Sequence, residues 1–216
     1  MLNIVIIGPQ GSGKGTQANL IAAKYKIANI STGEMFREAV KNQTDLGKAV
    51  KAIIDRGDLV PDDLTNELVK ERLSKDDCQF GFILDGYPRN LSQAEYLLTH
   101  QKITHVLEIW ISDEEAIKRI SGRRICSNCG TTYHVLYNPP KQENICDRCG
   151  GKLTQRDDDN EKSVKQRLKI YHQETESIIS FFQKKNLLYC INGEQRIPDV
   201  ARDVYSVLDK KNDIKE

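Results

Sequence analysis

The sequence lacks a long hydrophobic run. Its longest apolar stretches, such as HVLEIWI, are far shorter than the roughly 20 residues that a membrane-spanning helix needs. The first apolar stretch has no basic segment before it and no cleavage site after it, and it runs directly into a loop motif. We therefore expect a cytoplasmic protein, in which disulfides are not expected to form between the six cysteines.

An excess of charge of one sign is also missing. The chain has 32 Lys and Arg residues and 31 Asp and Glu residues, which gives a net charge of +1. This balance argues against a general attraction to nucleic acid or to an acidic membrane surface, so a nucleic-acid role would need a local basic patch. Repeats and low-complexity tracts are absent, and 216 residues are enough for one large domain or a core with inserts.

Short apolar runs alternate with longer helical patterns along most of the chain. The runs predict buried strands at 2–7, 80–85, 105–111 and 187–191. Helices are predicted at 14–25, 33–41, 45–56, 62–74, 91–99, 113–121 and 197–209, and one long amphipathic helix begins after 160. A strand that is followed by a loop, a helix and another strand favours right-handed crossovers, so we expect an α/β core with a parallel sheet.

Two stretches interrupt this alternation. Residues 31–60 carry helices with no obvious strand between them, and residues 122–159 are rich in Cys, Gly, Asn, Pro and Arg with no apolar run long enough for a core element. We expect both to be inserts on a single core made of residues 1–30, 61–121 and 160–216.

The stretch GPQGSGKGT, residues 8–16, has the pattern of a phosphate-binding loop. It lies between a predicted strand and a predicted helix, where backbone N–H groups and the helix N-terminus bind anions, and Lys14 adds a positive charge. The generic motif has Ser or Thr after the lysine to contact magnesium, whereas this chain has Gly15. Asp85, at the end of a predicted strand, is a second candidate for orienting Mg²⁺ or its waters.

Arginines lie at predicted strand ends and insert edges rather than on polar helix faces. A phosphoryl transfer between two nucleotides would gather about five phosphates in one cleft, and planar guanidinium groups suit that charge. The acidic run Asp157 to Asp159 either pairs with Arg123 or Arg124 when the lid closes or forms a solvated hinge. The candidate arginines are Arg37, Arg89, Arg119, Arg123, Arg124, Arg156 and Arg167.

Together, GPQGSGKGT, STGEMFR, FILDGYPRNLSQ, GRR and RDDD followed by Arg167 make the chain resemble adenylate kinases of the long, lidded type over nearly its whole length. The resemblance implies a P-loop three-layer α/β/α core with a parallel sheet, a helical insert at 31–60 that binds the nucleoside monophosphate, and a lid at 122–159. It also implies a monomer that interconverts ATP plus AMP with two ADP, using Mg²⁺. Gly15 is regular in that family, whereas Gln10 stands where the family usually has Pro.

The resemblance also implies roles for individual residues. The AMP side would comprise Thr32, Arg37, Asp58, Leu59, Val60, Gly86, Tyr87, Pro88, Arg89, Gln93, Arg156 and Arg167. The ATP side would comprise Gly11, Ser12, Gly13, Lys14, Gly15, Thr16, Arg119, Arg123, Thr132, Tyr133 and the backbone at Gln195. The catalytic set would be Lys14, Asp85, Arg89, Arg123, Arg156 and Arg167.

Four cysteines form two close pairs with zinc-ribbon spacing. Cys126 and Cys129 are followed, after sixteen residues, by Cys146 and Cys149. Two such knuckles supply four thiolates for one tetrahedral Zn²⁺, and a full set of protein ligands indicates a structural site. Two disulfides or four free thiols remain as alternatives, and His134 is a possible competing ligand.

Three other functions fit parts of this pattern. A GTP:AMP phosphotransferase would share the AMP-side residues, and only its donor would differ. A zinc-ribbon NTPase that binds nucleic acid would need a basic face, whereas Asp and Glu nearly balance Lys and Arg in 122–159. A regulatory nucleotide-binding module would bind ATP and AMP without converting them to ADP.

Overall fold

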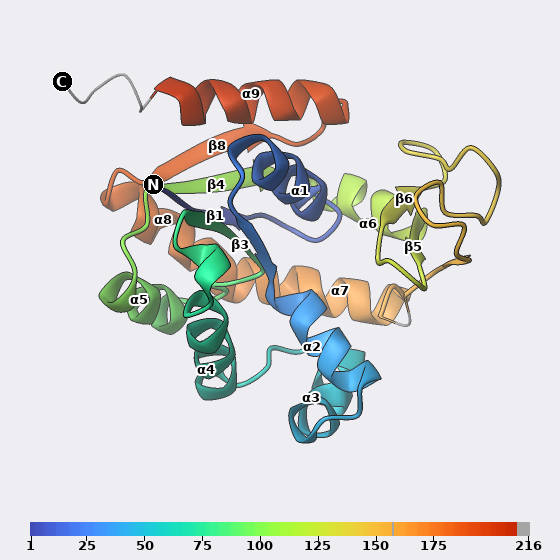
Figure 1. Cartoon of the computed structure of the whole chain (residues 1–216), viewed down its shortest axis with the longest axis horizontal. Coiled ribbons are helices and arrows are strands. Elements are labelled where there is room, and N and C mark those ends of the chain that lie inside the picture. Colours follow the sequence, from blue (N-terminus) through green and yellow to red (C-terminus); the bar gives the residue numbers. More distant parts are fainter. Residues whose placement is uncertain (157, 211–216) are drawn as a thin grey trace.

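The computed structural model describes residues 1–156 and 158–210, with the backbone alone at Glu161. In this part of the chain the central sheet has five strands, all parallel, in the order β2-β3-β1-β4-β8 (Figure 1). The strands are β1 (Leu2–Ile7), β2 (Ala28–Ser31), β3 (Gly81–Asp85), β4 (His105–Trp110) and β8 (Leu188–Asn192).

Helices cover both faces of this sheet, which explains the nearly continuous apolar sequence of its inner strands. On one face, Ile4 and Ile6 of β1 pack with α1 (Lys14–Tyr25) and α9 (Ile197–Lys210). On the other face, Val5 and Ile7 pack with α4 (Asp62–Leu73), α5 (Leu91–His100) and α8 (Glu176–Lys184). Figure 1 shows α9 and α1 above the sheet and α4, α5 and α8 below it. The predicted three-layer core is confirmed.

The first predicted insert contains α2 (Thr32–Lys41) and α3 (Asp45–Arg56). The two helices lie at the bottom of Figure 1, away from the sheet. They share a small core of their own around Phe36, Val50 and Val60.

The second predicted insert extends from the end of α6 (Asp113–Ser121) to the start of α7 (Glu161–Ile170). It holds an antiparallel sheet in the order β6-β5-β7, made of β6 (Thr132–His134), β5 (Arg123–Cys126) and β7 (Leu153–Thr154). These three short strands are not predicted from the sequence, because no apolar run in 122–159 is long enough to mark them. They lie to the right of the core in Figure 1.

Most predicted elements are confirmed to within a residue or two, but one strand of the central sheet was not predicted and one helix prediction is wrong. Strand β2 lies where no strand was predicted, because its sequence ANIS has little apolar character and only Ile30 is fully buried. The long helix after 160 is not continuous, since a π turn at Tyr171–Thr175 separates α7 from α8. A short 3-10 turn at Asp76–Cys78 precedes β3. None of the described helices combines the length and apolar character needed to cross a membrane.

Candidate active site and metal centre

A cavity of about 1110 Å³ lies beyond the carboxyl ends of the parallel strands. Its wall includes residues that end or follow β1, β2, β3 and β8, residues of both inserts, and the start of α9. In open parallel sheets, ligands bind at this edge, where successive crossovers leave the sheet in opposite directions. Strand order places β1, which precedes the phosphate loop, in the middle of the sheet.

The phosphate loop joins β1 to α1 with glycines in the left-handed region of φ. Gly11 has φ +80° and Gly13 has φ +90°. A Cβ at Gly11 would lie 2.9 Å from the Ala116 carbonyl oxygen, so the loop packs closely on α6 and tolerates only glycine there. Gly13 caps α1 with no side-chain hydrogen bond, which leaves the first N–H groups of the helix for an anion.

The Lys14 side chain folds back onto the phosphate loop. Its Nζ donates to the carbonyl oxygens of Gly8 at 2.7 Å and Pro9 at 2.8 Å. Burial lowers the pKa of Lys14 from 10.5 to about 8; Asp85 opposes that effect, and Arg89 and other nearby arginines add to it. The site therefore penalises a positive charge until an anion enters.

Asp85 lies beside the first turn of α1. A Cβ built on Gly15 would be 3.5 Å from the Asp85 Oδ2 atom. The parallel register of β1 and β3 pairs Asp85 with Ile6, so the carboxylate follows the sheet edge next to the phosphate loop. Hard carboxylate oxygens suit Mg²⁺, and Asp85 therefore fits the predicted role of holding the ion or its waters.

Six predicted arginines are brought together around this cavity, namely Arg37, Arg89, Arg119, Arg123, Arg156 and Arg167. Burial and the surrounding arginines lower the pKa of Arg156 and of Arg167 to about 9. Burial also lowers the pKa of Arg37 and of Arg89. The Nε of Arg156 is buried without a hydrogen-bond partner among the described residues. Such a cluster is suited to a ligand with several negative charges.

Acidic residues at the end of the second insert hold two of these arginines. Asp159 accepts from Arg123, with its Oδ2 at 2.8 Å from Nε, and Asp158 forms an ion pair with Arg167. The predicted pairing of this acidic run with Arg123 is confirmed. Arg124 instead donates to the backbone carbonyls of Ser121 and Arg123. Asp157 lies outside the described residues.

The predicted AMP-side residues line the part of the cavity between β3 and the first insert. Thr32 donates to the Gly86 carbonyl at 2.9 Å, and Gln93 accepts from the Arg89 N–H at 2.9 Å and donates to Asp62 at 2.7 Å. Tyr87 does not line the cavity, because its side chain is fully buried and donates to Asn66.

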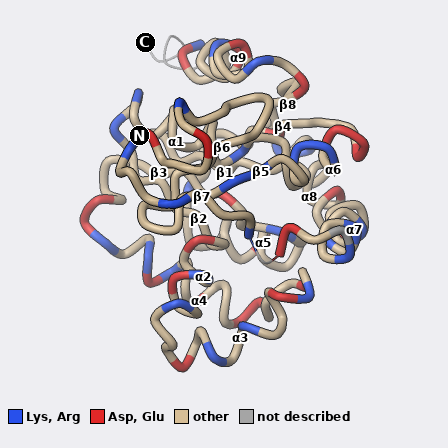
Figure 2. The backbone as a smooth tube through the Cα atoms, turned by 90° about the vertical axis from the view of Figure 1, so that its right-hand side faces the viewer, with Lys and Arg blue, Asp and Glu red and all other residues tan. Residues whose placement is uncertain are grey.

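The predicted ATP-side residues of the lid and of α9 line the opposite part. Tyr133 and Thr132 reach it from β6, and Gln195 reaches it from the loop before α9. The Gln195 side chain donates to the Asn192 carbonyl and to Asp203, so its backbone is the part left for a ligand. Figure 2 views the molecule from this side and shows the basic stretch at β5.

Two aromatic lid residues line the cavity although the sequence does not predict this position for either, namely Tyr137 and His134. Arg119 packs over the Tyr137 ring, with Cζ 5.3 Å from the ring centroid. The buried His134 ring accepts from the N–H groups of Leu136 and Tyr137 through Nδ1. Neither has a spacing signal in the sequence, since the fold of the lid alone places them. His134 does not belong to the group of four cysteines whose potential ligand atoms converge, so the geometry favours the cysteines over it as metal ligands.

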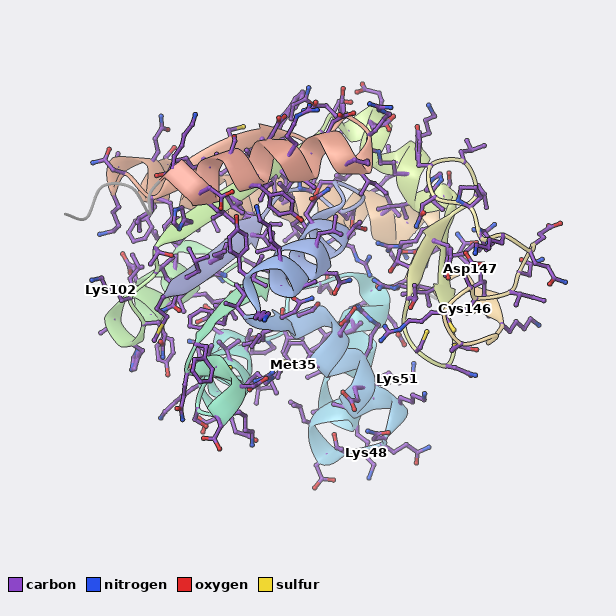
Figure 3. The ribbon with its side chains drawn as sticks, turned by 45° about the horizontal axis from the view of Figure 1, so that its top comes forward. Met35, Lys48, Lys51, Lys102, Cys146 and Asp147 are labelled. Atoms are coloured by element: carbon purple, nitrogen blue, oxygen red, sulfur yellow. The ribbon has the colours of Figure 1, made fainter. Side chains whose placement is uncertain are left out.

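The four predicted metal ligands converge in the lid. The Sγ atoms of Cys126, Cys129, Cys146 and Cys149 all lie within 4.8 Å of one another, and all four are free thiols. Each cysteine pair forms the same turn. The N–H of Gly130 donates to the backbone carbonyl of Cys126, and the N–H of Gly150 donates to the backbone carbonyl of Cys146. Both glycines have φ +71°. Figure 3 shows the sulfur atoms that gather beside Cys146. Four thiolates at this spacing fit one tetrahedral zinc ion.

Comparison with known proteins agrees with this geometry. The family model described as adenylate kinase matches residues 6–187. An adenylate kinase of Acetivibrio thermocellus is 50% identical over 96% of this chain and 98% of its own length. Those of Archaeoglobus fulgidus and Staphylococcus aureus are each 48% identical, over 97% and 96% of this chain and 99% of their own lengths.

Proposed function

The chain belongs to the adenylate kinase family, and from this premise we propose how its cavity binds two nucleotides and transfers a phosphoryl group between them. The chain is a nucleoside-monophosphate kinase that catalyses the reversible, magnesium-dependent reaction ATP + AMP = 2 ADP, which maintains the balance of adenine nucleotides. The observation that carries the proposed site is the group of partly buried arginines around the phosphate loop, which includes Arg156, whose buried Nε has no hydrogen-bond partner among the described residues.

The ATP phosphates bind in the phosphate loop. The loop N–H groups and the N-terminus of α1 donate to them, and Lys14 turns from the Gly8 and Pro9 carbonyls toward the new negative charge. Arg119 and Tyr137 hold the adenine at the lid. Asp85 would hold Mg²⁺ or its waters, and the bound ion would supply positive charge to neutralise the phosphates.

AMP binds between the first insert and the loop after β3. Thr32, Arg37 and the segment 58–60 border its nucleoside, and Gln93 reads the base edge. Arg89 and Arg156 bind its phosphate, which becomes the nucleophile. Its oxygen attacks the terminal phosphorus of ATP, and the bond from that phosphorus to the oxygen of the departing ADP breaks.

The protein has little covalent chemistry to perform in such a transfer. The arginines stabilise the extra negative charge that develops on the transferring group, and burial disfavours the free charge of Arg156 and of Arg167 in particular. Asp158 and Asp159 keep Arg167 and Arg123 oriented toward the cavity. The lid covers the phosphates and excludes water, which would otherwise accept the phosphoryl group in place of AMP.

We propose that the chain is divided into three domains: a core of residues 1–30, 61–121 and 160–216, an AMP-binding insert of residues 31–60, and a lid of residues 122–159. The lid holds one structural Zn²⁺ through Cys126, Cys129, Cys146 and Cys149. A flap of this size has too little core to be stable alone, and metal binding orders it. We also propose that the enzyme is monomeric and cytoplasmic, which sedimentation and fractionation test.

A coupled assay with purified protein tests the function. ATP and GTP serve as donors in turn, each with AMP, CMP, UMP or GMP as the acceptor. We expect the pair ATP and AMP to give the highest kcat/KM, with two ADP formed for each ATP consumed. A GTP preference would identify a GTP:AMP phosphotransferase, and failure to form ADP from ATP and AMP would overturn the proposal.

A further inference from the structure

Arg89 follows β3 in a loop and is bound through its backbone and its side chain. Its N–H donates to the Gln93 side chain at 2.9 Å. Its Nε donates to the Gly86 carbonyl at 2.7 Å. Because Nε is committed to that carbonyl, only the two terminal nitrogens of the guanidinium can donate to a phosphate. The Arg89 carbonyl lies before the first turn of α5, where no helical N–H can reach it.

Thr175 supplies the partner for this carbonyl. Its hydroxyl donates to the Arg89 oxygen at 2.9 Å across 86 positions of sequence. The Thr175 residue is only 8% exposed, so water cannot readily replace the bond. Thr175 and Arg89 both line the cavity.

The π turn between α7 and α8 places Thr175 there. The turn Tyr171–Thr175 contributes two buried polar side chains, Tyr171 and Thr175. Both line the cavity wall, and the Tyr171 hydroxyl lies 3.5 Å from the Glu108 carboxylate on β4. π turns interrupt helices mostly at functional sites, which agrees with this position. Figure 1 shows α7 running below the sheet toward α8, with α5 nearby.

We propose that Thr175 is a positioning residue: its hydroxyl fixes the Arg89 backbone, and through it the guanidinium that binds the AMP phosphate. The inference rests on the proposed function of Arg89. Without the hydroxyl, the partly buried Arg89 carbonyl loses its Thr175 donor, and the loop from Gly86 to Arg89 shifts to find another. The loop also carries Gly86, which accepts from Thr32, so AMP binding is the step affected most.

Thr175→Val is the first test, because it keeps the shape of the side chain and removes the hydroxyl. We expect KM for AMP to rise about threefold to tenfold and kcat to fall by a similar factor, the scale of one lost hydrogen bond, with KM for ATP changed less than twofold. Thr175→Ser should restore both values to within twofold of wild type. Thr175→Cys, with its weak S–H donor, should be intermediate.

Ser177→Ala is the matched control. Ser177 lies two residues further on, is exposed, and donates to the local Glu174 carbonyl. It should leave all constants unchanged. Melting temperatures of every variant, measured by calorimetry, show whether each is folded at the assay temperature. If Thr175→Val is unstable, the Ser and Cys variants still give the graded comparison.

A double-mutant cycle with Arg89→Lys separates this inference from the proposed function. If Thr175 acts through Arg89, Thr175→Val adds little to the effect of Arg89→Lys on KM for AMP. Fully additive effects would overturn the positioning role, as would a Thr175→Val enzyme with wild-type constants or equal increases in both KM values. If Arg89→Lys alone leaves KM for AMP and kcat unchanged, the role proposed for Arg89 fails instead.

Discussion

Lys14 and the arginines around it concentrate positive charge where water solvates it poorly. In the folded protein the pKa of Lys14 is about 8, mainly because of burial, whereas the ordinary value of 10.5 applies to the unfolded chain. Between these two pH values the unfolded chain binds the extra proton, so this group makes the folded protein more stable as pH rises from about 8 to 10.5. Below pH 8 the charge costs at most about 3 kcal/mol of stability.

Lys14→Met should therefore separate stability from activity. The rate should fall roughly 10³-fold or more, on the scale of arginine-finger effects, because the charge on the ATP phosphates loses its partner. At pH 7 and without nucleotide, the variant should melt above wild type, although loss of the bonds to Gly8 and Pro9 offsets part of the gain. Calorimetry from pH 7 to 10.5 should show that the difference in melting temperature between Lys14→Met and wild type becomes smaller as wild-type Lys14 loses its proton.

The control is Lys48→Met, which changes an exposed lysine on α3 that Figure 3 shows pointing away from the core. It should leave the rate unchanged and shift the melting temperature by a small amount that does not depend on pH. A Lys14→Met difference that stays constant from pH 7 to 10.5 would contradict the burial argument. A rate loss below tenfold would contradict the role given to Lys14.

Gln10 links the phosphate loop to the helix that leaves the lid. Its Nε2 donates to the Val164 carbonyl on α7. Gln10→Met keeps the length of the side chain and removes the donor, so we expect a loss of about 1 kcal/mol. For a chain of this size, that loss lowers the melting temperature by about 2–4 °C. The control is Gln79→Met, at an exposed glutamine whose side chain donates to nearby Asp76, and it should lower the melting temperature by less. Equal changes in melting temperature for the two variants would show that the bond from Gln10 to Val164 contributes nothing specific.

At the scale of the elements, the sequence predicts the strands that are marked by apolar runs and the loops that are marked by a motif. Strands β1, β3, β4 and β8 follow from apolar runs, and the phosphate loop follows from its glycines and Lys14. β2 was missed because ANIS has no apolar signal, and its pairing with β3 is non-local. The π turn was missed because buried positions Leu168, Tyr171 and Ile178 keep helical spacing across it. Tyr137 and His134 are placed by the lid fold, which backbone pairing and the cysteine cluster establish without a large core.

The lid should depend on its metal more than the reaction does. Cys149→Ser removes one thiolate of the four, so we expect zinc well below one ion per chain and a melting temperature lower by several degrees. The rate at 25 °C should fall by a smaller factor, because the phosphate loop and Arg89 lie on the core. Elemental analysis, calorimetry and the coupled assay measure the three quantities.

Cys190→Ser is the control for this prediction, because Cys190 is an exposed thiol on β8, outside the metal cluster. It should keep its zinc and its melting temperature. Wild-type protein without stoichiometric zinc would refute the metal site. A Cys149→Ser enzyme that loses its rate entirely while it stays folded would refute a purely structural role.

For the whole molecule, one cavity has to hold both nucleotides with their phosphates between them. The phosphate loop and lid border one part, the first insert borders the other, and the arginines contact both. Two adenosines joined by five phosphates should therefore bind as one ligand across the whole cavity. At equal concentration it should raise the melting temperature more than ATP or AMP does, because it makes both sets of contacts and loses its freedom of motion once.

The matched control is the same compound with three phosphates, which is too short to place both adenosines. We expect it to stabilise the protein no more than ATP does. Each tenfold gain in affinity adds 1.4 kcal/mol under saturating conditions, so a separation of several degrees between the two compounds is measurable. Arg156→Ala should reduce that separation, since the buried Nε of Arg156 has no hydrogen-bond partner within the described part of the chain and is free to donate to a phosphate. If the two compounds stabilise the protein equally, the cavity does not bind both nucleotides at once, and the two-nucleotide site is wrong even where the phosphate loop is right.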